Sequence, residues 1–165
     1  MKLGDGVEQA IHSVTMLAHL TPEGVLSAAA LAEFHGVSPS YLLKHLQALS
    51  GAGIVVTVPG PRGGYRLAKP TADISLLDIV LAVEGPQPAF RCNEIRQRGP
   101  NPLPGKPAKP CGIASAMLRA ERAYRAELAG TSIAHILADL RETDTSGEIE
   151  ARGCAFLAIN ERRQA

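Results

Sequence analysis

Apolar side chains recur at helical spacing near the start of the chain. They stand three or four residues apart, which places them on one face of a helix; the set comprises Val7, Ala10, Ile11, Val14, Leu17 and Ala18. The opposite stripe of this helix is polar and includes Glu8 and His12. Because Pro22 and Gly24 follow, we expect the helix to end before them.

Two further helices are predicted before residue 53. The first is short, covers about residues 27–34, and stops near Gly36. The second begins after Ser38, which favours the N-cap, with Pro39 at the first helical position. Its apolar face is expected to comprise Leu42, Leu43, Leu46 and Leu49, and Gly51 and Gly53 mark its end.

A β-hairpin and a fourth helix follow. The β-branched run of residues 54–58 predicts a strand, the glycine- and proline-rich residues 59–64 predict a tight turn, and residues 65–67 return. The next helix covers about residues 76–83, where Ser75 and Asp78 have the spacing of a capping box. Three helices and a glycine-tipped hairpin in this order predict a mainly α fold, a winged helix-turn-helix.

Proline divides the chain at one place. Residues 86–110 hold seven of the twelve prolines, which suit neither a helix interior nor a central strand. Beyond this loop, helical spacing predicts a long helix over about residues 113–128 and a last one over about 131–140. The charged segment that follows predicts at most a weak helix or a mobile tail. The predicted organisation is a winged module (1–85), a proline-rich loop (86–111), a helical pair (112–141) and a charged tail (142–165).

Composition narrows the class of protein. The 165 residues are 45% hydrophobic and 20% charged, which suits one globular domain with an appendage. No apolar run reaches the roughly 18 residues of a membrane span, and the N-terminus lacks the apolar core of a signal peptide. We therefore expect a cytoplasmic protein with no membrane partner. Its three cysteines, an odd count, are available for metal or redox chemistry.

The winged module carries candidate DNA-binding residues, although the net charge of +1 gives no support for nucleic-acid binding by itself. The helix after Ser38 takes the place of a recognition helix, whose N-terminal residues meet base edges in the major groove. Its outward side chains are expected to be Ser38, Ser40, Tyr41, Lys44 and His45. Arg62, at the tip of the hairpin, is placed to enter a narrow minor groove of double-stranded DNA. The alternative is a helical bundle with an incidental hairpin, which leaves the glycines of the turn without a purpose.

Four sequence blocks together resemble one family. They are Ser-Pro-Ser-Tyr-Leu at 38–42, Ala-Gly-Ile-Val at 52–55, Gly-Pro-Arg-Gly-Gly-Tyr-Arg-Leu at 60–67 and Asp-Ile-Val-Leu-Ala-Val-Glu-Gly at 78–85. These blocks are similar to those of the bacterial winged-helix regulators that include IscR and NsrR, many of which carry an iron–sulfur cluster. The resemblance implies a homodimer held by the long helix, which binds a pseudo-palindromic operator and acts as a repressor or activator of transcription.

The proline-rich loop departs from the usual cluster site of this family. Members with a cluster usually draw three closely spaced cysteines from the loop, whereas here it offers Cys92 and Cys111 at its two ends. The residues around Cys92, from 88 to 100, resemble the redox-sensing RsrR type within the family. That resemblance implies a two-iron, two-sulfur (2Fe-2S) cluster whose ligands are Cys92 and Cys111 of one chain and Glu8 and His12 of the other. The pair on the first helix is four residues apart and therefore shares one helical face.

Three other interpretations stay open at this point. Two cysteines, one histidine and one glutamate also satisfy tetrahedral zinc, which has no redox chemistry. A regulator without metal would respond to thiol oxidation, a small molecule or a partner protein. An enzyme is disfavoured, because the sequence shows neither a nucleophile–base signature nor a phosphate-binding loop. Cys154, in the charged tail, is expected to be a free thiol.

Overall fold

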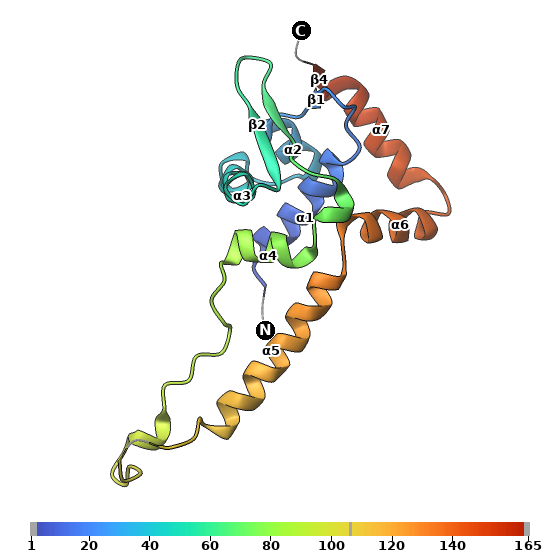
Figure 1. Cartoon of the computed structure of the whole chain (residues 1–165). Helices are drawn as coiled ribbons and strands as arrows, with labels where there is room; N and C mark the ends of the chain where they lie inside the picture. Colours follow the sequence, from blue (N-terminus) through green and yellow to red (C-terminus); the bar gives the residue numbers. More distant parts are fainter. Residues whose placement is uncertain (1–2, 106, 164–165) are drawn as a thin grey trace.

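The computed structural model describes residues 3–105 and 107–163, which form a helical body and a long projecting arm (Figure 1). The body opens with three helices: α1 (Asp5–Leu17), α2 (Ala28–His35) and α3 (Pro39–Gly51). Their apolar faces meet in one core, where Val14, Leu31 and Leu46 are completely buried. Burying one such side chain contributes about 1.5–3 kcal/mol, so the three helices are held together as one unit.

Local signals place the helix ends. The Ser27 hydroxyl accepts a backbone N–H hydrogen bond and caps α2, and Gly36 ends that helix in the left-handed conformation with φ 64°. This φ suits glycine because it has no Cβ to clash with the backbone. α3 begins as predicted, but the Ser38 hydroxyl lies 3.1 Å from the hydroxyl of Ser40 and makes no capping hydrogen bond.

The wing is an antiparallel hairpin of β2 (Val55–Val58) and β3 (Gly64–Leu67). Gly60 takes φ 105° in the turn, a conformation that other residues rarely adopt. Backbone hydrogen bonds of 3.1 and 2.7 Å between Leu26 and Tyr65 tie the hairpin to the segment after α1. With this hairpin behind the three helices, the predicted mainly α, winged helix-turn-helix fold is confirmed.

The arm starts after the winged module. The next elements are the 3₁₀ turn η1 (Thr71–Asp73) and α4 (Leu76–Glu84). The predicted capping box of Ser75 and Asp78 is present at the start of α4. The proline-rich loop then leaves the body, passes through the 3₁₀ turn η2 (Ile95–Gln97), and is followed by α5 (Gly112–Gly130), which runs back toward the body (Figure 1).

α5 carries apolar side chains on its outer surface. Ile113, Met117 and Leu118 are 68%, 45% and 37% exposed. A row of large apolar groups in water is unfavourable, and a projecting helix with such a row is suited to burial against a second chain.

The C-terminal segment differs from the prediction. The expected last helix is present as α6 (Ile133–Thr143). Over 142–165 the sequence predicts at most a weak helix or a mobile tail, and the described part is largely helical and contributes to the core. That part contains α7 (Glu148–Asn160) and the strand β4 (Arg162–Arg163), and residues 164 and 165 lie outside the described residues.

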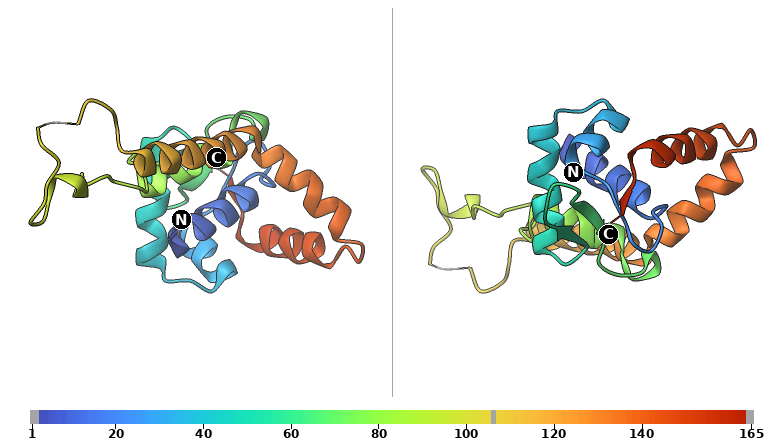
Figure 2. Two further views of the ribbon diagram at one scale, coloured as in Figure 1. Left: turned by 90° about the horizontal axis from the view of Figure 1, so that it is seen from below. Right: turned by 90° about the horizontal axis from the view of Figure 1, so that it is seen from above.

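α7 is packed on the body. Leu157 is buried, the ring of Phe156 lies 4.9 Å from the ring of Phe34 in α2, and the guanidinium of Arg152 lies 4.7 Å above the same Phe34 ring. The few apolar residues of the tail therefore join the core of a distant part of the chain. α6 and α7 lie on the opposite side of the body from the proline-rich loop (Figure 2).

The strand β4 pairs with β1 (Gly24–Val25) in antiparallel register, with Val25 opposite Arg162. The end of the described chain is thereby fixed next to the wing. Among the described residues, none of the helices combines the length and apolarity that a membrane span requires.

Candidate DNA interface and metal-ligating residues

The N-terminal part of α3 presents polar side chains to solvent. Four of those predicted to face outward are exposed: Ser38, Ser40, Tyr41 and Lys44. Their hydroxyl and ammonium groups are able to bond phosphate oxygens and base edges. Arg62 is also exposed, in the turn of the wing. These five side chains have the positions that a winged helix-turn-helix uses on DNA.

His45 does not face outward as predicted. Its side chain is only 6% exposed and packs between α3 and α1. A Cβ added to Gly6 of α1 would lie 2.6 Å from His45 Nε2, so the ring fills the space above that glycine. The ring also meets the ring of Tyr41 edge-on, with 4.6 Å between centroids. Burial, aided by the charge of Lys44, lowers the pKa of His45, while Glu84 opposes the shift.

The cause of this error is visible in the helix spacing. His45 follows Leu42 by three residues and precedes Leu49 by four, and both leucines are completely buried. Residues at this spacing share one face of a helix, so His45 belongs to the inner face. Leu43 was assigned to that face because it is apolar, but it is 37% exposed. His45 therefore belongs to the contact between α1 and the recognition helix.

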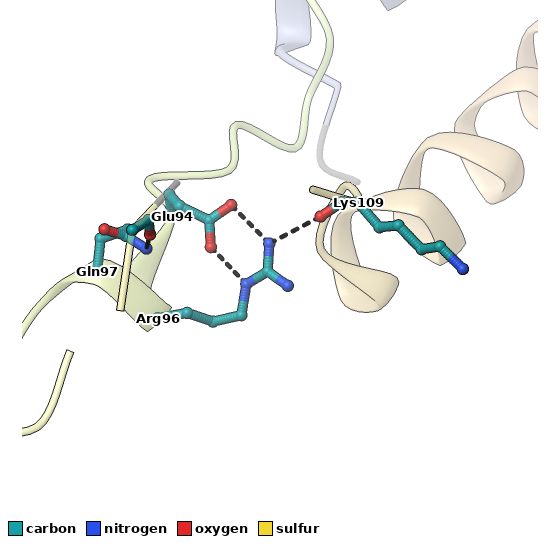
Figure 3. Close-up of polar contacts among 5 residues, drawn as sticks. Glu94, Arg96, Gln97 and Lys109 are labelled. Atoms are coloured by element: carbon teal, nitrogen blue, oxygen red, sulfur yellow. Dashed lines mark hydrogen bonds and ion pairs between the residues drawn. The ribbon is translucent and has the colours of Figure 1, made fainter. Parts of the chain in front are cut away.

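The two loop cysteines share one neighbouring cation, Arg96. Cys92 is exposed, and Cys111, directly before α5, is half-buried. Arg96 Nη2 donates to Glu94 Oε2 at 2.9 Å and to the carbonyl of Lys109 at 3.3 Å, which links the two halves of the loop (Figure 3). The bonds to Glu94 raise the pKa of Arg96, and the charges of Cys111 and Cys92 raise it further. The guanidinium of Arg96 therefore lies in the neighbourhood of both cysteines.

Cys111 has the surroundings of a reactive thiol. The nearby backbone N–H groups of Ala114 and Ile113, at the start of α5, lower the pKa of the Cys111 thiol. The charge of Arg96 lowers this pKa further, whereas burial and Glu94 oppose the shift. Because the thiolate is the form that binds metal, the helix end and the arginine both favour ligation.

A second arginine holds the beginning of the loop against α5. Arg125 Nη2 donates to the carbonyls of Pro86 and Gln87 at 3.1 and 3.2 Å. Arg125 Nε donates to Glu121, which is 9% exposed and also accepts from the N–H of Ala89 at 3.1 Å. This pair was not among the predicted residues, although opposite charges four residues apart on a helix are a detectable signal. The loop is thus fastened to α5 where it leaves the body.

Glu8 and His12 are exposed and lie one turn apart on α1, as predicted. They line a hollow of about 370 Å³ at the N-terminal end of α1. The His12 ring lies 5.6 Å from the ring of His35. Cys154, an exposed free thiol as expected, lines a second hollow of about 280 Å³ together with these two histidines.

One chain does not bring the four expected ligands together. Within residues 3–105 and 107–163, no three residues among histidine, cysteine, aspartate and glutamate are grouped so that they could hold a metal ion. Cys92 and Cys111 form one half of a potential site on the arm, and Glu8 with His12 forms a separate pair on α1. The arm carries two thiols and α1 carries a carboxylate and an imidazole, so the two pairs lie on different parts of the molecule.

Comparison with known proteins bears on both the fold and the function. Residues 3–139 match the model of the Rrf2 family, described as an iron-dependent transcriptional regulator. The HTH-type transcriptional regulator YffB of Lactococcus lactis is 37% identical over 136 residues, which cover 82% of this chain and 86% of YffB. The family model spans the winged module, the proline-rich loop and most of the helical pair.

Two solved structures share the fold. IscR of T. potens matches with a TM-score of 0.67 at 24% identity, covering 88% of this chain and 92% of that protein. CymR, the global cysteine regulator of B. subtilis, matches with a TM-score of 0.65 at 22% identity, covering 84% and 97%. Together with the family match over residues 3–139, these results establish that the chain belongs to the Rrf2 family of transcriptional regulators, which are DNA-binding proteins and not enzymes.

Proposed function

We propose that this Rrf2 regulator is a cytoplasmic homodimer that senses redox state through a 2Fe-2S cluster. In this proposal, Cys92 and Cys111 of one chain and Glu8 and His12 of the partner subunit hold the cluster. Rrf2 regulators are typically dimeric, and the family includes iron–sulfur members such as IscR. The cluster and its signal are our inference for this chain.

The pairing of Cys92 and Cys111 around Arg96 carries the proposal. Two thiolates on one loop occupy only two of the four protein ligand positions of such a cluster. No group of three potential ligands occurs among the described residues, which supports our inference that the remaining ligands come from a second chain. Exposed Glu8 and His12, with a hollow beside them, are suited to receive the arm of that chain.

The chemistry of the donor set fits a cluster that changes oxidation state readily. Imidazole in place of thiolate removes negative charge and raises the reduction potential of a 2Fe-2S centre. Arg96 and the backbone N–H groups at the start of α5 stabilise negative charge on the cysteine side. On the other side, His12 is able to take up a proton when the negative charge of the site increases.

α1 offers a direct route from the ligands to DNA. Glu8 follows Gly6 by two residues, and Gly6 packs against His45 of the recognition helix. Displacement of α1 at Glu8 or His12 therefore changes how His45, and with it Tyr41, is held. We propose that this contact alters operator affinity, with the exposed residues of α3 in the major groove and Arg62 in the minor groove.

Anaerobic purification tests the cluster. The wild-type chain is expected to show visible absorbance, with iron and inorganic sulfide in equal amounts. Cys92→Ser and Cys111→Ser should each lose the colour and the sulfide while keeping wild-type helical circular dichroism. Cys154→Ser is the matched control and should keep them. Full sulfide in Cys92→Ser would refute the ligand set, and bound zinc without sulfide would support the zinc alternative.

Operator affinity tests the sensing role. The affinity of the intact dimer for its operator is measured with the cluster reduced and reoxidised, at one salt concentration. We expect the two affinities to differ, and Glu8→Ala and His12→Ala to remove the difference. A bound cluster whose reduction leaves the affinity unchanged would exclude redox sensing through this site.

A further inference from the structure

The C-terminal strand extends the wing. β4 pairs with β1, and the segment directly after β1 is bonded to β3 through Leu26 and Tyr65. β4, the last described element, therefore lies close to the hairpin (Figure 1). Arg162 and Arg163 form this strand, and both are exposed.

Three arginines lie around the turn of the wing, although about a hundred residues separate Arg62 from Arg162 and Arg163. Arg62, Arg162 and Arg163 line one open hollow of about 750 Å³. Arg162 Nη1 lies 3.4 Å from the carbonyl of Pro61, the residue before Arg62. The positive charge of the wing is thus continued by the end of the chain.

The carboxylates nearby offset only part of this charge. Glu161 also lines the hollow, but its Oε1 accepts a hydrogen bond from the backbone N–H of Thr21 at 3.2 Å and another from the Thr21 hydroxyl. Glu23, directly before β1, is exposed and is the other acidic residue next to the paired strands β1 and β4. Arg66 of β3 adds a fourth arginine to this region, so its positive charges outnumber the two glutamates.

β4 is held in place rather than being a loose end. Buried Leu157 anchors the last turns of α7, directly before the strand. Gly24 allows the Glu161 side chain to approach, because a Cβ at Gly24 would lie 2.8 Å from Glu161 Cδ. An anchored arginine loses less conformational entropy when it binds an anion than one on a flexible tail.

We propose that Arg162 and Arg163 bind phosphates of double-stranded DNA next to the minor groove that the wing enters. The inference rests on the DNA binding of the Rrf2 family and on a wing that faces the duplex. Phosphates line both edges of a minor groove, and guanidinium groups are well suited to them. The contact is independent of base sequence, and it enlarges the DNA interface from α3 and the hairpin to the C-terminus.

The salt dependence of operator binding tests this proposal. Each phosphate contact contributes about 0.9 to the slope of log affinity against log salt. Because the dimer carries each arginine twice, Arg162→Gln with Arg163→Gln should therefore lower the slope by about 3.6 and weaken binding roughly fivefold to tenfold per phosphate contact at about 0.1 M salt. Arg163→Gln should produce about half of the slope change. Arg141→Gln, which removes an equally exposed charge from α6, is the matched control and should leave the slope unchanged.

DNA length separates phosphate binding from an effect on folding. On a duplex that ends at the edge of the wing contact, the affinities of wild type and the double variant should become equal. Their melting temperatures should also be equal. If wild type binds its operator and the double variant keeps the full salt slope, the proposal is wrong. If wild type shows no operator preference, DNA recognition itself is refuted, which is a different outcome.

Discussion

The contact between Gly6 and His45 joins the proposed ligand helix to the recognition helix, and Gly6→Ala perturbs it directly. The new Cβ would lie 2.6 Å from His45 Nε2 and 3.1 Å from Nδ1, whereas ordinary contacts are 3.4–4 Å. The ring must therefore move by about 1 Å, away from a site in which it is 6% exposed and packed on Tyr41. Overpacking of this kind costs about 1–3 kcal/mol.

Alanine also favours the helix, which offsets part of this cost. The gain in helix propensity is at most about 1 kcal/mol, so the free energy of unfolding should still fall, by up to about 2 kcal/mol. Gly153→Ala in α7 is the matched control, because a Cβ there meets no atom within 4 Å. That variant should be more stable than wild type by about 0.5–1 kcal/mol.

Urea denaturation at one fixed protein concentration measures both variants. His45→Ala should relieve the strain, so the Gly6→Ala/His45→Ala double variant should be more stable than the sum of the single effects by about 1 kcal/mol or more. Gly6→Ala should also change operator affinity, because the displaced ring supports Tyr41. If Gly6→Ala stabilises as much as Gly153→Ala, or if the two effects simply add, His45 does not couple the helices as argued.

Three further predictions concern single side chains. Tyr41→Ala should weaken operator binding about tenfold, as expected for the loss of a hydrogen bond between Tyr41 and DNA. Dimerisation, measured by sedimentation, should not change. Unchanged operator affinity would show that Tyr41 does not contact DNA. Leu157→Ala should lower the free energy of unfolding by about 2–4 kcal/mol and should speed amide exchange throughout α7 but not in α3. An equal increase in exchange rate in both helices would contradict the independent packing of α7 on the body. The lowered pKa of His45 means that the folded state binds fewer protons than the unfolded state, so stability is lost as pH falls below the ordinary value of 6.5. His45→Gln should flatten this loss, and parallel stability profiles would refute it.

Much of the fold follows from local sequence signals. The spacing of Leu42, Leu46 and Leu49 predicts α3, and the Ser75–Asp78 spacing predicts a capping box that the structure contains. The turn glycine Gly60 has the positive φ that a tight hairpin requires. Each of these features is decided by residues within a few positions of one another, which is why periodicity and turn chemistry are sufficient.

Contacts between distant residues account for most of the differences. α7 has few apolar side chains, and its docking depends on Phe156 meeting Phe34. The pairing of β1 with β4 joins two-residue strands from opposite ends of the chain, which no local pattern indicates. The four expected cluster ligands are a further case, because one chain leaves the cysteines and the α1 pair apart. In our proposal they meet between two chains, and the sequence suggests that meeting only through family resemblance.

Iron and sulfide in a mixed dimer test the shared site most directly. One chain carries Cys92→Ser with Cys111→Ser, the other carries Glu8→Ala with His12→Ala, and two different tags isolate the mixed species. If each cluster takes its cysteines from one subunit and its Glu8 and His12 from the other, one complete site remains. The mixed dimer should then hold about half the iron and sulfide of wild type, and each parent homodimer should hold almost none. A mixed dimer as empty as its parents would show that the ligands come from within one chain and would contradict the account.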